Sequence, residues 1–457
     1  MTPVRIVADT TLRRLGPRTW AGGAPMRVLR LSERGSTIVQ RIASGEGWCP
    51  GEPAELALAD RLVAGGAAHP SFAGESPPPP VAAEVTLVVP VRDDPDGLAR
   101  VLRMPGGLAG CEVVVVDDAS AEPTSVAELA AATGARLVRH PTARGPAAAR
   151  NSGLALVDTP LVLFADADVD LTGVDLGLLA AHLGRSEVAA VAPRVRGTGG
   201  RGRTGRHDRN RGPLDMGPVP STVRPGAPVA YVPTATLLAR AGTLRAVGGF
   251  DESLRFGEDV DLVWRLVAAG MQVRYEPATV VHHRVRSGTR AWLRQRYEYG
   301  TSAGGLARRH PGKLAPVVVS PWSLLAWGAS LAGQPLVATS VVAGSTVALL
   351  GRLRDADAAA VTRVVLEGHL LAGRQLARAV LRPWWPAAVL AAVASRRARR
   401  VVAACVAVEV ATSGGPPAQR ILGLLDHLAY SAGVWSSAVR TRTVGPLLPR
   451  TGRLRVG

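Results

Sequence analysis

Four short apolar runs, separated by stretches of helical character, constrain the fold of this chain most strongly. They lie at residues 85–89, 113–116, 161–164 and 188–191. Apolar runs of this length that alternate with helices are typical of a parallel sheet covered by helices. We therefore predict an α/β domain over residues 81–300, with a doubly wound, mainly parallel sheet.

The third apolar run leads directly into two carboxylates, Asp166 and Asp168. The carboxyl ends of strands border the ligand crevice of an open parallel sheet. Hard divalent cations prefer oxygen ligands such as carboxylates. This stretch therefore predicts a cation site at the edge of the sheet.

A glycine-proline turn at the start of residues 144–153 predicts the beginning of a helix. The positive end of that helix, together with Arg144 and Arg150, favours binding of an anion. A second helix is predicted within residues 257–270, which carry acids in the first turn and a glycine at the end, and Asp261 and Arg265 are spaced to pair on one face of it.

Residues 194–228 are rich in Gly, Arg and Pro and show no periodicity, which predicts a long mobile loop. Long loops beside a crevice often act as lids. The loop would therefore cover the predicted site.

The amino-terminal residues 1–76 predict a small α+β module. Residues 27–31 have strand character, residues 37–42 and 54–63 have helical character, and the prolines at 77–80 predict an extended spacer. The pattern suggests a winged-helix-like module that recognises a peptide or a partner protein. A capping subdomain without a ligand is an equally good interpretation.

Residues 301–457 predict a helical, membrane-associated region. Residues 314–351 contain no charged residue or histidine, and Pro335 divides them into two pieces near the lower limit for a membrane span. Basic flanks on both sides favour a hairpin that returns to the side it started from. The alternative is a buried helical pair in a soluble domain.

Further basic residues follow this apolar stretch. An interfacial amphipathic helix is predicted where charged residues share one helical face, at Arg363, Glu367, Arg374, Arg378 and Arg382. A second cluster would suit anionic head groups, although a solvated face is the simpler interpretation: Arg396, Arg397, Arg399 and Arg400.

Composition limits the classes of partner and compartment. The net charge is +18 with a single lysine, and aromatic residues make up 4 % of the chain, which argues against a nucleic-acid stacking surface. Three widely spaced cysteines predict neither a disulfide framework nor a zinc site. With no apolar signal segment at the start, we predict a location at the cytoplasmic face of the cell membrane.

Six motifs follow one another between residues 81 and 300: VVPVR at 88–92, DDAS at 117–120, RGPAAARNSG at 144–153, DAD at 166–168, GGFDE at 248–252 and GEDVDLVWRL at 257–266. In this order they resemble the motifs of the family 2 glycosyltransferases, which have the GT-A fold. The resemblance implies an inverting transferase that uses a nucleotide sugar and a divalent metal, Mn²⁺ or Mg²⁺.

A narrower resemblance comes from residues 211–217, residues 231–233 and the amino-terminal module, which are similar to the glycosyltransferases of mycofactocin systems. It implies transfer of glucose from UDP-glucose to a peptide-derived redox cofactor or its precursor, with growth of a short β-1,4-linked glucan. A transferase acting on a lipid-linked or cell-envelope glycan, and a non-catalytic membrane-bound nucleotide-sugar sensor, remain alternatives.

The resemblance also assigns roles to individual residues. Asp118, or alternatively its neighbour Asp117, would accept a hydrogen bond from uracil. Asp168 would bind the metal, Asp166 would lie nearer the ribose and also contribute to the metal site, and His282, next to His283, would add a further metal or phosphate contact. The other expected contacts to the nucleotide sugar are Pro90, Arg144, Arg150 and Asn151.

The catalytic base implied by the resemblance is Asp259, with Glu258 as the second choice. Both could instead be acids that merely stabilise a helix start, an effect of about 0.3–1 kcal/mol. The chain has Gln295-Arg-Tyr297 in place of the QxxRW motif of processive relatives. We therefore do not expect processive synthesis through a large transmembrane channel.

Overall fold

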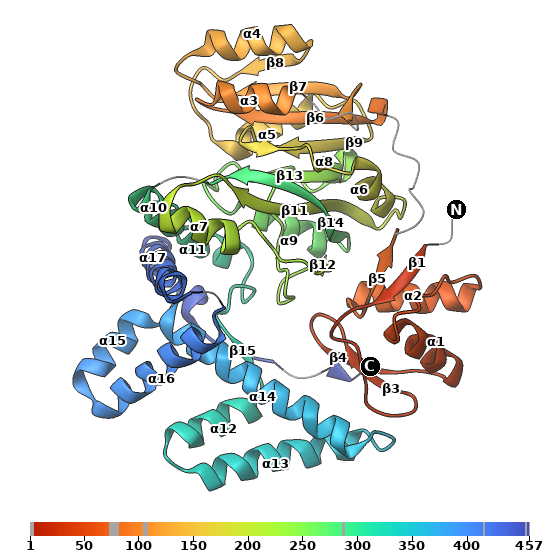
Figure 1. Cartoon of the computed structure of the whole chain (residues 1–457), viewed down its shortest axis with the longest axis vertical. Helices are drawn as coiled ribbons and strands as arrows, with labels where there is room; N and C mark the ends of the chain where they lie inside the picture. The colour runs from red at the N-terminus through yellow and green to blue at the C-terminus, as the bar shows by residue number, and fades with distance from the viewer. Residues whose placement is uncertain are drawn as a thin grey trace. The chain divides into compact units, whose positions relative to one another are not determined.

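The computed structural model describes residues 4–72, 82–103, 108–285, 288–414, 416–452 and 455–456. The predicted proline spacer at 77–80 lies outside these residues. The chain forms two compact units, Pro70–Trp292 and a second one made of Met1–His69 with Leu293–Gly457 (Figure 1). This grouping differs from the three-part division predicted at 1–76, 81–300 and 301–457.

The unit Pro70–Trp292 is built on a nine-stranded sheet. Its strand order is β10-β14-β11-β13-β9-β6-β7-β8, with β12 paired to β14. The strands are β6 (Val85–Val91), β7 (Glu112–Asp117), β8 (Arg136–Arg139), β9 (Leu161–Ala165), β10 (Val169–Asp170), β11 (Val188–Thr198), β12 (Ser221–Val223), β13 (Thr236–Arg240) and β14 (Gln272–Arg284).

The four apolar runs of the sequence all lie in strands, and β6, β7, β8 and β9 pair in parallel. The sheet as a whole is mixed, because β13 inserts antiparallel between β9 and β11, and β10 and β12 run antiparallel to β14. Strand β11 nevertheless pairs in parallel with β14 along most of its length. The expectation of a mainly parallel sheet therefore holds for β9-β6-β7-β8 and for β14-β11, and it is interrupted where β13, β10 and β12 pair antiparallel.

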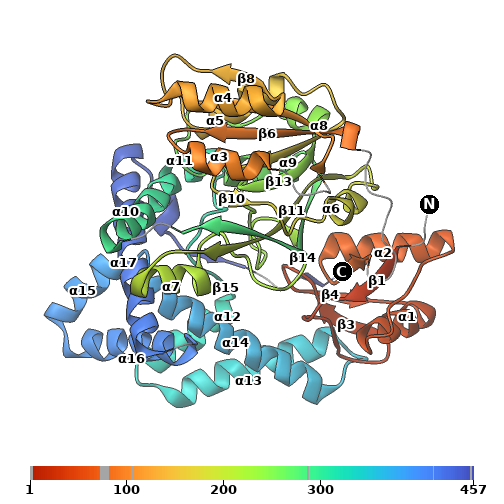
Figure 2. The ribbon, with the colours of Figure 1, turned by 45° about the horizontal axis from the view of Figure 1, so that its top comes forward.

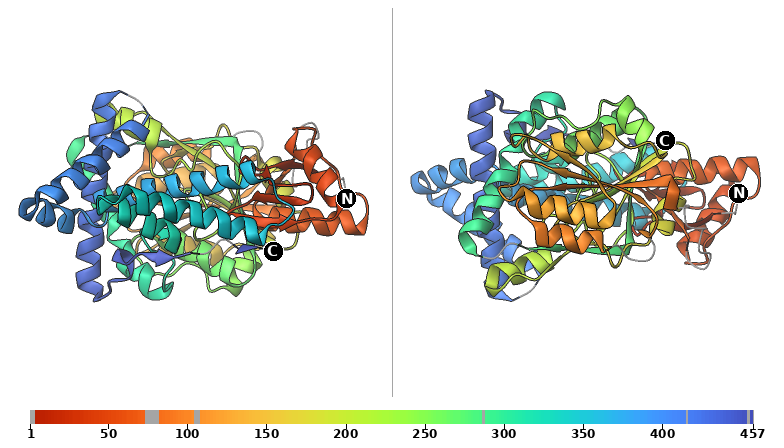
Figure 3. Two further views of the ribbon diagram at one scale, coloured as in Figure 1. Left: turned by 90° about the horizontal axis from the view of Figure 1, so that it is seen from below. Right: turned by 90° about the horizontal axis from the view of Figure 1, so that it is seen from above.

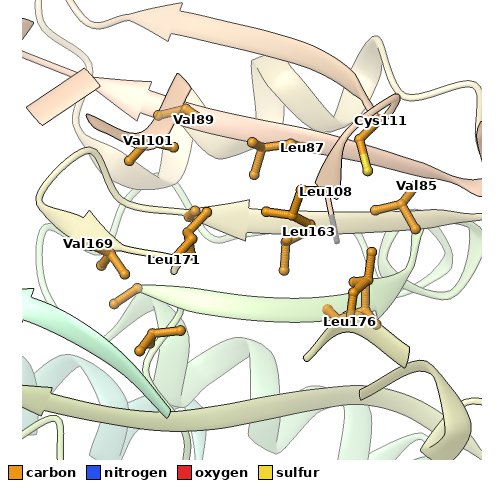
Figure 4. Close-up of a cluster of buried hydrophobic side chains, with 14 of the residues drawn as sticks. Val85, Leu87, Val89, Val101, Leu108, Cys111, Leu163, Val169, Leu171 and Leu176 are labelled. Atoms are coloured by element: carbon orange, nitrogen blue, oxygen red, sulfur yellow. The ribbon is translucent and has the colours of Figure 1, made fainter. Parts of the chain in front are cut away.

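Helices cover both faces of this sheet. Leu87 and Val89 face α3 (Pro95–Leu102), α4 (Pro123–Thr133) and α6 (Leu176–His182) in one apolar cluster (Figure 4). Val88 points to the opposite face, since side chains alternate along a strand. There a Cβ atom added to Gly153 of α5 (Pro146–Ala155) would lie 2.3 Å from Val88 Cγ1, so only glycine permits this approach. Figure 2 shows these layers from a second direction.

The predicted mobile loop at 194–228 is instead ordered structure. Strand β11 continues to Thr198, and α7 (Gly202–Arg211) and β12 follow it. Arg194 binds Asp215 through two hydrogen bonds of 2.8 and 2.9 Å. Side-chain contacts between residues far apart in the sequence order this segment. Such contacts leave no periodic pattern in the sequence, which is why the loop prediction was wrong.

The amino-terminal module contains the predicted strand and both predicted helices, β4 (Arg27–Arg30), α1 (Glu33–Ala43) and α2 (Pro53–Gly65). Strands β2 (Arg13–Arg14), β3 (Thr19–Gly22) and β4 form an antiparallel sheet, to which the short β17 (Arg455–Val456) adds in parallel. The strands β1 (Arg5–Ala8) and β5 (Ala68–Ser71) form a separate pair.

This module packs on the carboxyl-terminal helices. Leu15 and Val28 of the module share an apolar cluster with Leu353 and Val361. Thr19 Oγ1 donates a hydrogen bond of 2.9 Å to Asp355. The outer face of the small sheet is therefore covered by helices that lie more than 300 positions further along the chain, which is why residues 1–69 group with residues 293–457.

The carboxyl-terminal region is helical. Its helices are α10 (Thr289–Gly300), α11 (Ser302–Arg309), α12 (Pro321–Leu331), α13 (Pro335–Arg352), α14 (Ala358–Leu381), α15 (Trp385–Ala394), α16 (Arg396–Thr412) and α17 (Pro417–Thr441). Helices α12, α13 and α14 lie side by side (Figure 3, left). Pro335 starts α13 after a short turn, so residues 314–351 contain the expected helical hairpin.

Among the described residues, α13 alone is long and apolar enough to cross a membrane by length and composition, and 11 % of its most apolar window is buried. Its partner α12 has 11 residues, which at about 1.5 Å per residue is too short to cross a bilayer core of about 30 Å. A transmembrane hairpin does not follow from these lengths.

Candidate active site

Asp118 follows β7 and holds the loop that leads into α5. Its Oδ1 atom accepts hydrogen bonds from Arg144 N–H and His140 Nδ1, and its Oδ2 atom accepts one from Gly145 N–H, each at 2.8 Å. Burial alone would raise the pKa of Asp118, but these three hydrogen bonds outweigh it, and the pKa is lowered. The charged carboxylate thus fixes the backbone just before α5.

His140 is a residue that the sequence analysis missed. Its ring is buried between Asp118 and Ser152, with Nε2 2.9 Å from Ser152 Oγ. Because a carboxylate can only accept, Nδ1 donates to Asp118, and Nε2 lies within hydrogen-bonding distance of the serine hydroxyl. The available signal was its position directly after β8, at the same edge of the sheet as Asp118.

Asp117 has different partners. Its carboxylate accepts from Ser120 N–H at 2.8 Å and forms an ion pair with Arg139 at the end of β8. Pro90 lies on the neighbouring strand β6, opposite Val116 in the register. The predicted nucleotide residues Pro90, Asp117 and Asp118 are therefore brought together at one edge of the sheet.

Arg144 and Asn151 contact the GGFDE segment. Arg144 pairs with Glu252 at 2.8 Å, and both side chains are exposed. Asn151 Nδ2 donates to Phe250 O at 2.8 Å and to Glu252 Oε1 at 3.0 Å, while its Oδ1 accepts from Phe250 N–H at 2.8 Å. Gly249 has a φ of +65°, and a Cβ there would lie 2.6 Å from Asn151 Oδ1.

Arg150 is the buried centre of the site. Its side chain is 5 % exposed, and its two terminal nitrogens bind Asp166 Oδ1 at 2.7 Å and Glu258 Oε1 at 2.9 Å. The guanidinium carbon also lies 5.6 Å from the centre of the Phe250 ring. Burial would lower the pKa of Arg150, but Asp166 and Glu258 raise it by more, so the group stays charged.

The candidate base Asp259 lies beside this network in the first turn of α9 (Glu258–Ala268). Burial and the neighbouring charge of Glu258 raise its pKa to about 7, against the opposing effects of the Val260 N–H and Arg150. Gly257 precedes the helix with a φ of +82°, which glycine adopts without strain. A carboxylate with a pKa near neutrality is suited to accept a proton from a hydroxyl group.

The other end of α9 is also held. The predicted pair forms, with Arg265 Nε 2.7 Å from Asp261 Oδ2. Arg265 also donates to the carbonyls of Val247 and Gly249, each at 2.6 Å. These bonds connect α9 to the same GGFDE segment that Asn151 binds.

Asp168 contacts a histidine other than the one predicted. Asp168 Oδ2 lies 3.1 Å from His283 Nε2, and the Asp168 side chain is 40 % exposed. His282 pairs with Asp170 in the register of β10 and β14. Neighbouring side chains on a strand point to opposite faces, so His283 faces Asp168 and His282 does not.

The donor set fits a divalent cation in part. Among the described residues there is no cluster of three or more His, Cys, Asp or Glu side chains arranged to hold a metal ion. Asp168 and His283 offer an oxygen and a nitrogen, and one oxygen of Asp166 is engaged by Arg150. Mg²⁺ commonly binds through one or two carboxylates together with substrate phosphates, and these residues match that arrangement.

The chain is similar in sequence to known glycosyltransferases. The model of the family described as Glycosyl transferase family 2 matches residues 86–240. The pre-mycofactocin glycosyltransferase of Mycobacterium tuberculosis is 36 % identical over 472 residues, covering 97 % of each chain. The chain belongs to the family 2 glycosyltransferases.

Other members and solved structures are more distant. The succinoglycan biosynthesis protein ExoU of Rhizobium meliloti is 30 % identical over 203 residues, covering 42 % of this chain and 59 % of that protein. The mannosyltransferase PcManGT from Pyrobaculum calidifontis, in complex with GDP-Man and Mn²⁺, covers 80 % of this chain and 89 % of its own, with 19 % identity and a TM-score of 0.41. TarS from S. aureus, in complex with UDP, covers 48 % and 65 %, with 18 % identity and a TM-score of 0.35.

Proposed function

We propose that this family 2 glycosyltransferase moves glucose from UDP-glucose to mycofactocin, a peptide-derived redox cofactor, or to its precursor, and builds a short β-1,4-linked glucan with inversion at each transfer. The name of the 36 % identical relative supports the acceptor. One observation supports the proposed transfer chemistry most directly. Arg150 connects Asp166 of the DAD motif to Glu258, next to the base candidate Asp259.

Asp259 acts as the general base in this proposal. It takes the proton from the acceptor hydroxyl while that oxygen forms a bond to the anomeric carbon and the bond from this carbon to UDP breaks. The attack comes from the face opposite UDP, which inverts the configuration. Glu258 is bound by Arg150, so its role is to fix Arg150 and to raise the pKa of Asp259.

The diphosphate lies at the Asp166–Asp168 end of the site. Asp168 and Asp166 are the proposed carboxylate ligands of a divalent cation, Mn²⁺ or Mg²⁺, and His283 replaces His282 as the histidine beside them. When bound, the cation neutralises the charge that develops on the leaving UDP. Arg150 keeps Asp166 oriented toward this end.

The uridine lies at the Pro90, Asp117 and Asp118 edge. Asp118 already accepts three hydrogen bonds, which favours a role in shaping the loop around uracil. A direct hydrogen bond from uracil to Asp118 would be a fourth. Arg144 is exposed and paired only with an exposed glutamate among its described contacts, so it is free to exchange this partner for a phosphate. Asn151 holds the GGFDE segment in place.

Two further proposals concern the other unit. The amino-terminal module, residues 1–76, acts as a winged-helix-like domain that recognises the peptide part of the acceptor or a pathway protein. The helical region, residues 301–457, associates with the cytoplasmic face of the cell membrane. Its support is α13 together with many exposed apolar side chains on α12 to α15.

Transfer is tested with purified protein, a panel of UDP-sugars, and either the peptide-derived acceptor or a lipid-linked glycan. We expect mass increments of one hexose on the peptide-derived acceptor with UDP-glucose, dependent on Mn²⁺ or Mg²⁺ and abolished in Asp168→Ala. Glucose on the lipid-linked acceptor alone would favour the alternative acceptor, which the exposed apolar helices also suit. Metal-dependent turnover in Asp168→Ala would contradict the assignment of the cation site.

A non-catalytic nucleotide-sugar sensor is distinguished by Asp259→Asn. The sensor hypothesis expects UDP-sugar binding and biological function to survive this change. Retained binding, measured by calorimetry, with loss of hexose transfer supports an enzyme.

A further inference from the structure

Helix α15 is an apolar helix that the rest of its unit leaves uncovered. None of its ten residues is buried. Three aliphatic side chains are conspicuously exposed: Val389 at 48 %, Leu390 at 73 % and Val393 at 77 %. Figure 1 shows α15 at the outer side of the carboxyl-terminal helices, next to α16. These three aliphatic side chains are therefore left largely uncovered by the described part of the chain.

The start of this helix is nevertheless firmly attached. Trp384 Nε1 donates to the carbonyl of Leu447 at 2.7 Å, and Trp435 Nε1 donates to the carbonyl of Pro383 at 2.6 Å. Helix α15 also packs against α14 and α16. The exposed side chains thus belong to a fixed element of the unit.

The four arginines that follow α15 are positioned for an anion outside the chain. Arg396, Arg397, Arg399 and Arg400 occupy the start of α16 and are all exposed. The amino-terminal end of a helix carries partial positive charge, so cations there destabilise the helix. None of the four forms an ion pair with a described carboxylate; Arg397 and Arg399 donate to the carbonyls of Leu331 and Ala392.

The length of α15 limits how this helix can associate with a membrane. Ten residues of α-helix extend about 15 Å, half of a bilayer core of about 30 Å. A helix of this length with an apolar surface and adjacent arginines suits the plane of the membrane interface, where apolar side chains enter the acyl boundary and cations meet anionic head groups.

We propose that α15 and the first turn of α16 form an interfacial anchor that binds bilayers containing anionic lipid. Leu390 and Val393 enter the head-group and acyl boundary, and Arg396 and Arg400 bind the lipid phosphates. The proposal rests on the membrane association proposed above, and it places the contact at α15 instead of a span at α13. It is independent of the transfer reaction.

The test is sedimentation of the full-length protein with vesicles of phosphatidylcholine alone or mixed with phosphatidylglycerol. We expect binding to the anionic vesicles, weaker at high salt, and little binding to neutral ones. Leu390→Gln/Val393→Gln is expected to weaken binding at least tenfold, since each side chain loses the gain from apolar burial. Arg396→Gln/Arg400→Gln is expected to weaken it about fivefold per arginine.

A matched control substitutes the equally exposed apolar residues of α13. Leu336 and Val347 are 83 % and 68 % exposed, and Leu336→Gln/Val347→Gln is expected to bind anionic vesicles like the wild type. Wild-type binding by the α15 variant, or loss of binding in the α13 variant, would overturn the anchor. So would a change of oligomeric state in the α15 variant without a change in vesicle binding, because a second copy of the chain would then cover this surface.

Two further measurements separate this proposal from the proposed function. Circular dichroism checks that each variant is folded, and transfer to a soluble acceptor checks the catalytic unit. Vesicle binding with the expected losses but no transfer in any variant would contradict the proposed reaction and leave the anchor standing.

Discussion

The two compact units use arginine in opposite settings. In the unit Pro70–Trp292, Arg150 is buried and bound to two carboxylates. In the other unit, Arg396 and Arg400 are exposed and form no ion pair with a described carboxylate. The buried arginine holds two carboxylates of the candidate site at fixed positions, whereas the exposed arginines leave their charge available to an external partner.

Energetics explains why the distinction matters. Removing one member of a buried ion pair costs about 3–5 kcal/mol, because the remaining charge is left without compensation. An exposed pair contributes about 0–1 kcal/mol. Arginine-rich composition therefore says little about function until the burial of each guanidinium is known.

The largest effect is expected at Asp259, which lies beside the buried network. Asp259→Asn removes the proposed base, and we expect the transfer rate to fall by about 10²–10⁴-fold. UDP-sugar affinity is expected to stay close to that of the wild type. Single-turnover kinetics and calorimetry measure the two quantities. A rate within tenfold of the wild type would show that another group accepts the proton.

The next largest effect concerns Arg150. Arg150→Met leaves Asp166 and Glu258 without their shared cation, and we expect the free energy of unfolding to fall by about 3–5 kcal/mol. Chemical denaturation measures this change. The matched control is Arg144→Met, whose exposed pair with Glu252 predicts a loss of no more than about 1 kcal/mol. Equal losses in the two variants would break the distinction between buried and exposed arginine.

A smaller effect is expected on the pH dependence of the transfer rate, which tests the raised pKa of Asp259. Asp259 accepts a proton only when ionised, and its pKa is raised to about 7, so the rate is expected to rise with pH through the neutral range. Glu258→Gln removes a negative charge that raises this pKa, and the acidic limb of the profile should move to lower pH. Burial, which is the larger cause of the raised pKa of Asp259, remains in this variant. A shift toward higher pH would contradict the assignment.

The smallest effect is expected for an exposed arginine. Arg396→Gln removes a charge from the positive end of α16, and we expect the free energy of unfolding to change by no more than about 0.5 kcal/mol. Thermal denaturation of the purified protein checks this. A loss above 2 kcal/mol would show that this arginine stabilises the fold itself.

Those parts of the fold that depend on local pattern could be predicted from the sequence. The apolar runs at 85–89, 113–116 and 161–164 became β6, β7 and β9, and the helices that follow β6 and β7 begin with proline. Strand β13 could not be predicted in the same way. The strand has only five residues, and its antiparallel pairing with β9 and β11 depends on distant chain segments.

The candidate site likewise has a part that local pattern predicts and a part that depends on contacts between distant segments. The motifs identified the acids, but they did not show which partner each acid has. The choice between His282 and His283 depends on the register of β10 against β14, which no local pattern encodes. Likewise, Arg150 was predicted to contact the nucleotide, and only the packing of α5 shows that its guanidinium lies between Asp166 and Glu258.

The attachment of α9 at both ends has a kinetic consequence. Glu258 is bound by Arg150 in the first turn, and Arg265 binds the Val247 and Gly249 carbonyls near the last. The proposed base is therefore in place before an acceptor arrives. Water can then occupy the position of the acceptor hydroxyl, and we expect slow hydrolysis of the sugar nucleotide in the absence of acceptor, with the acceptor suppressing this side reaction by filling the site.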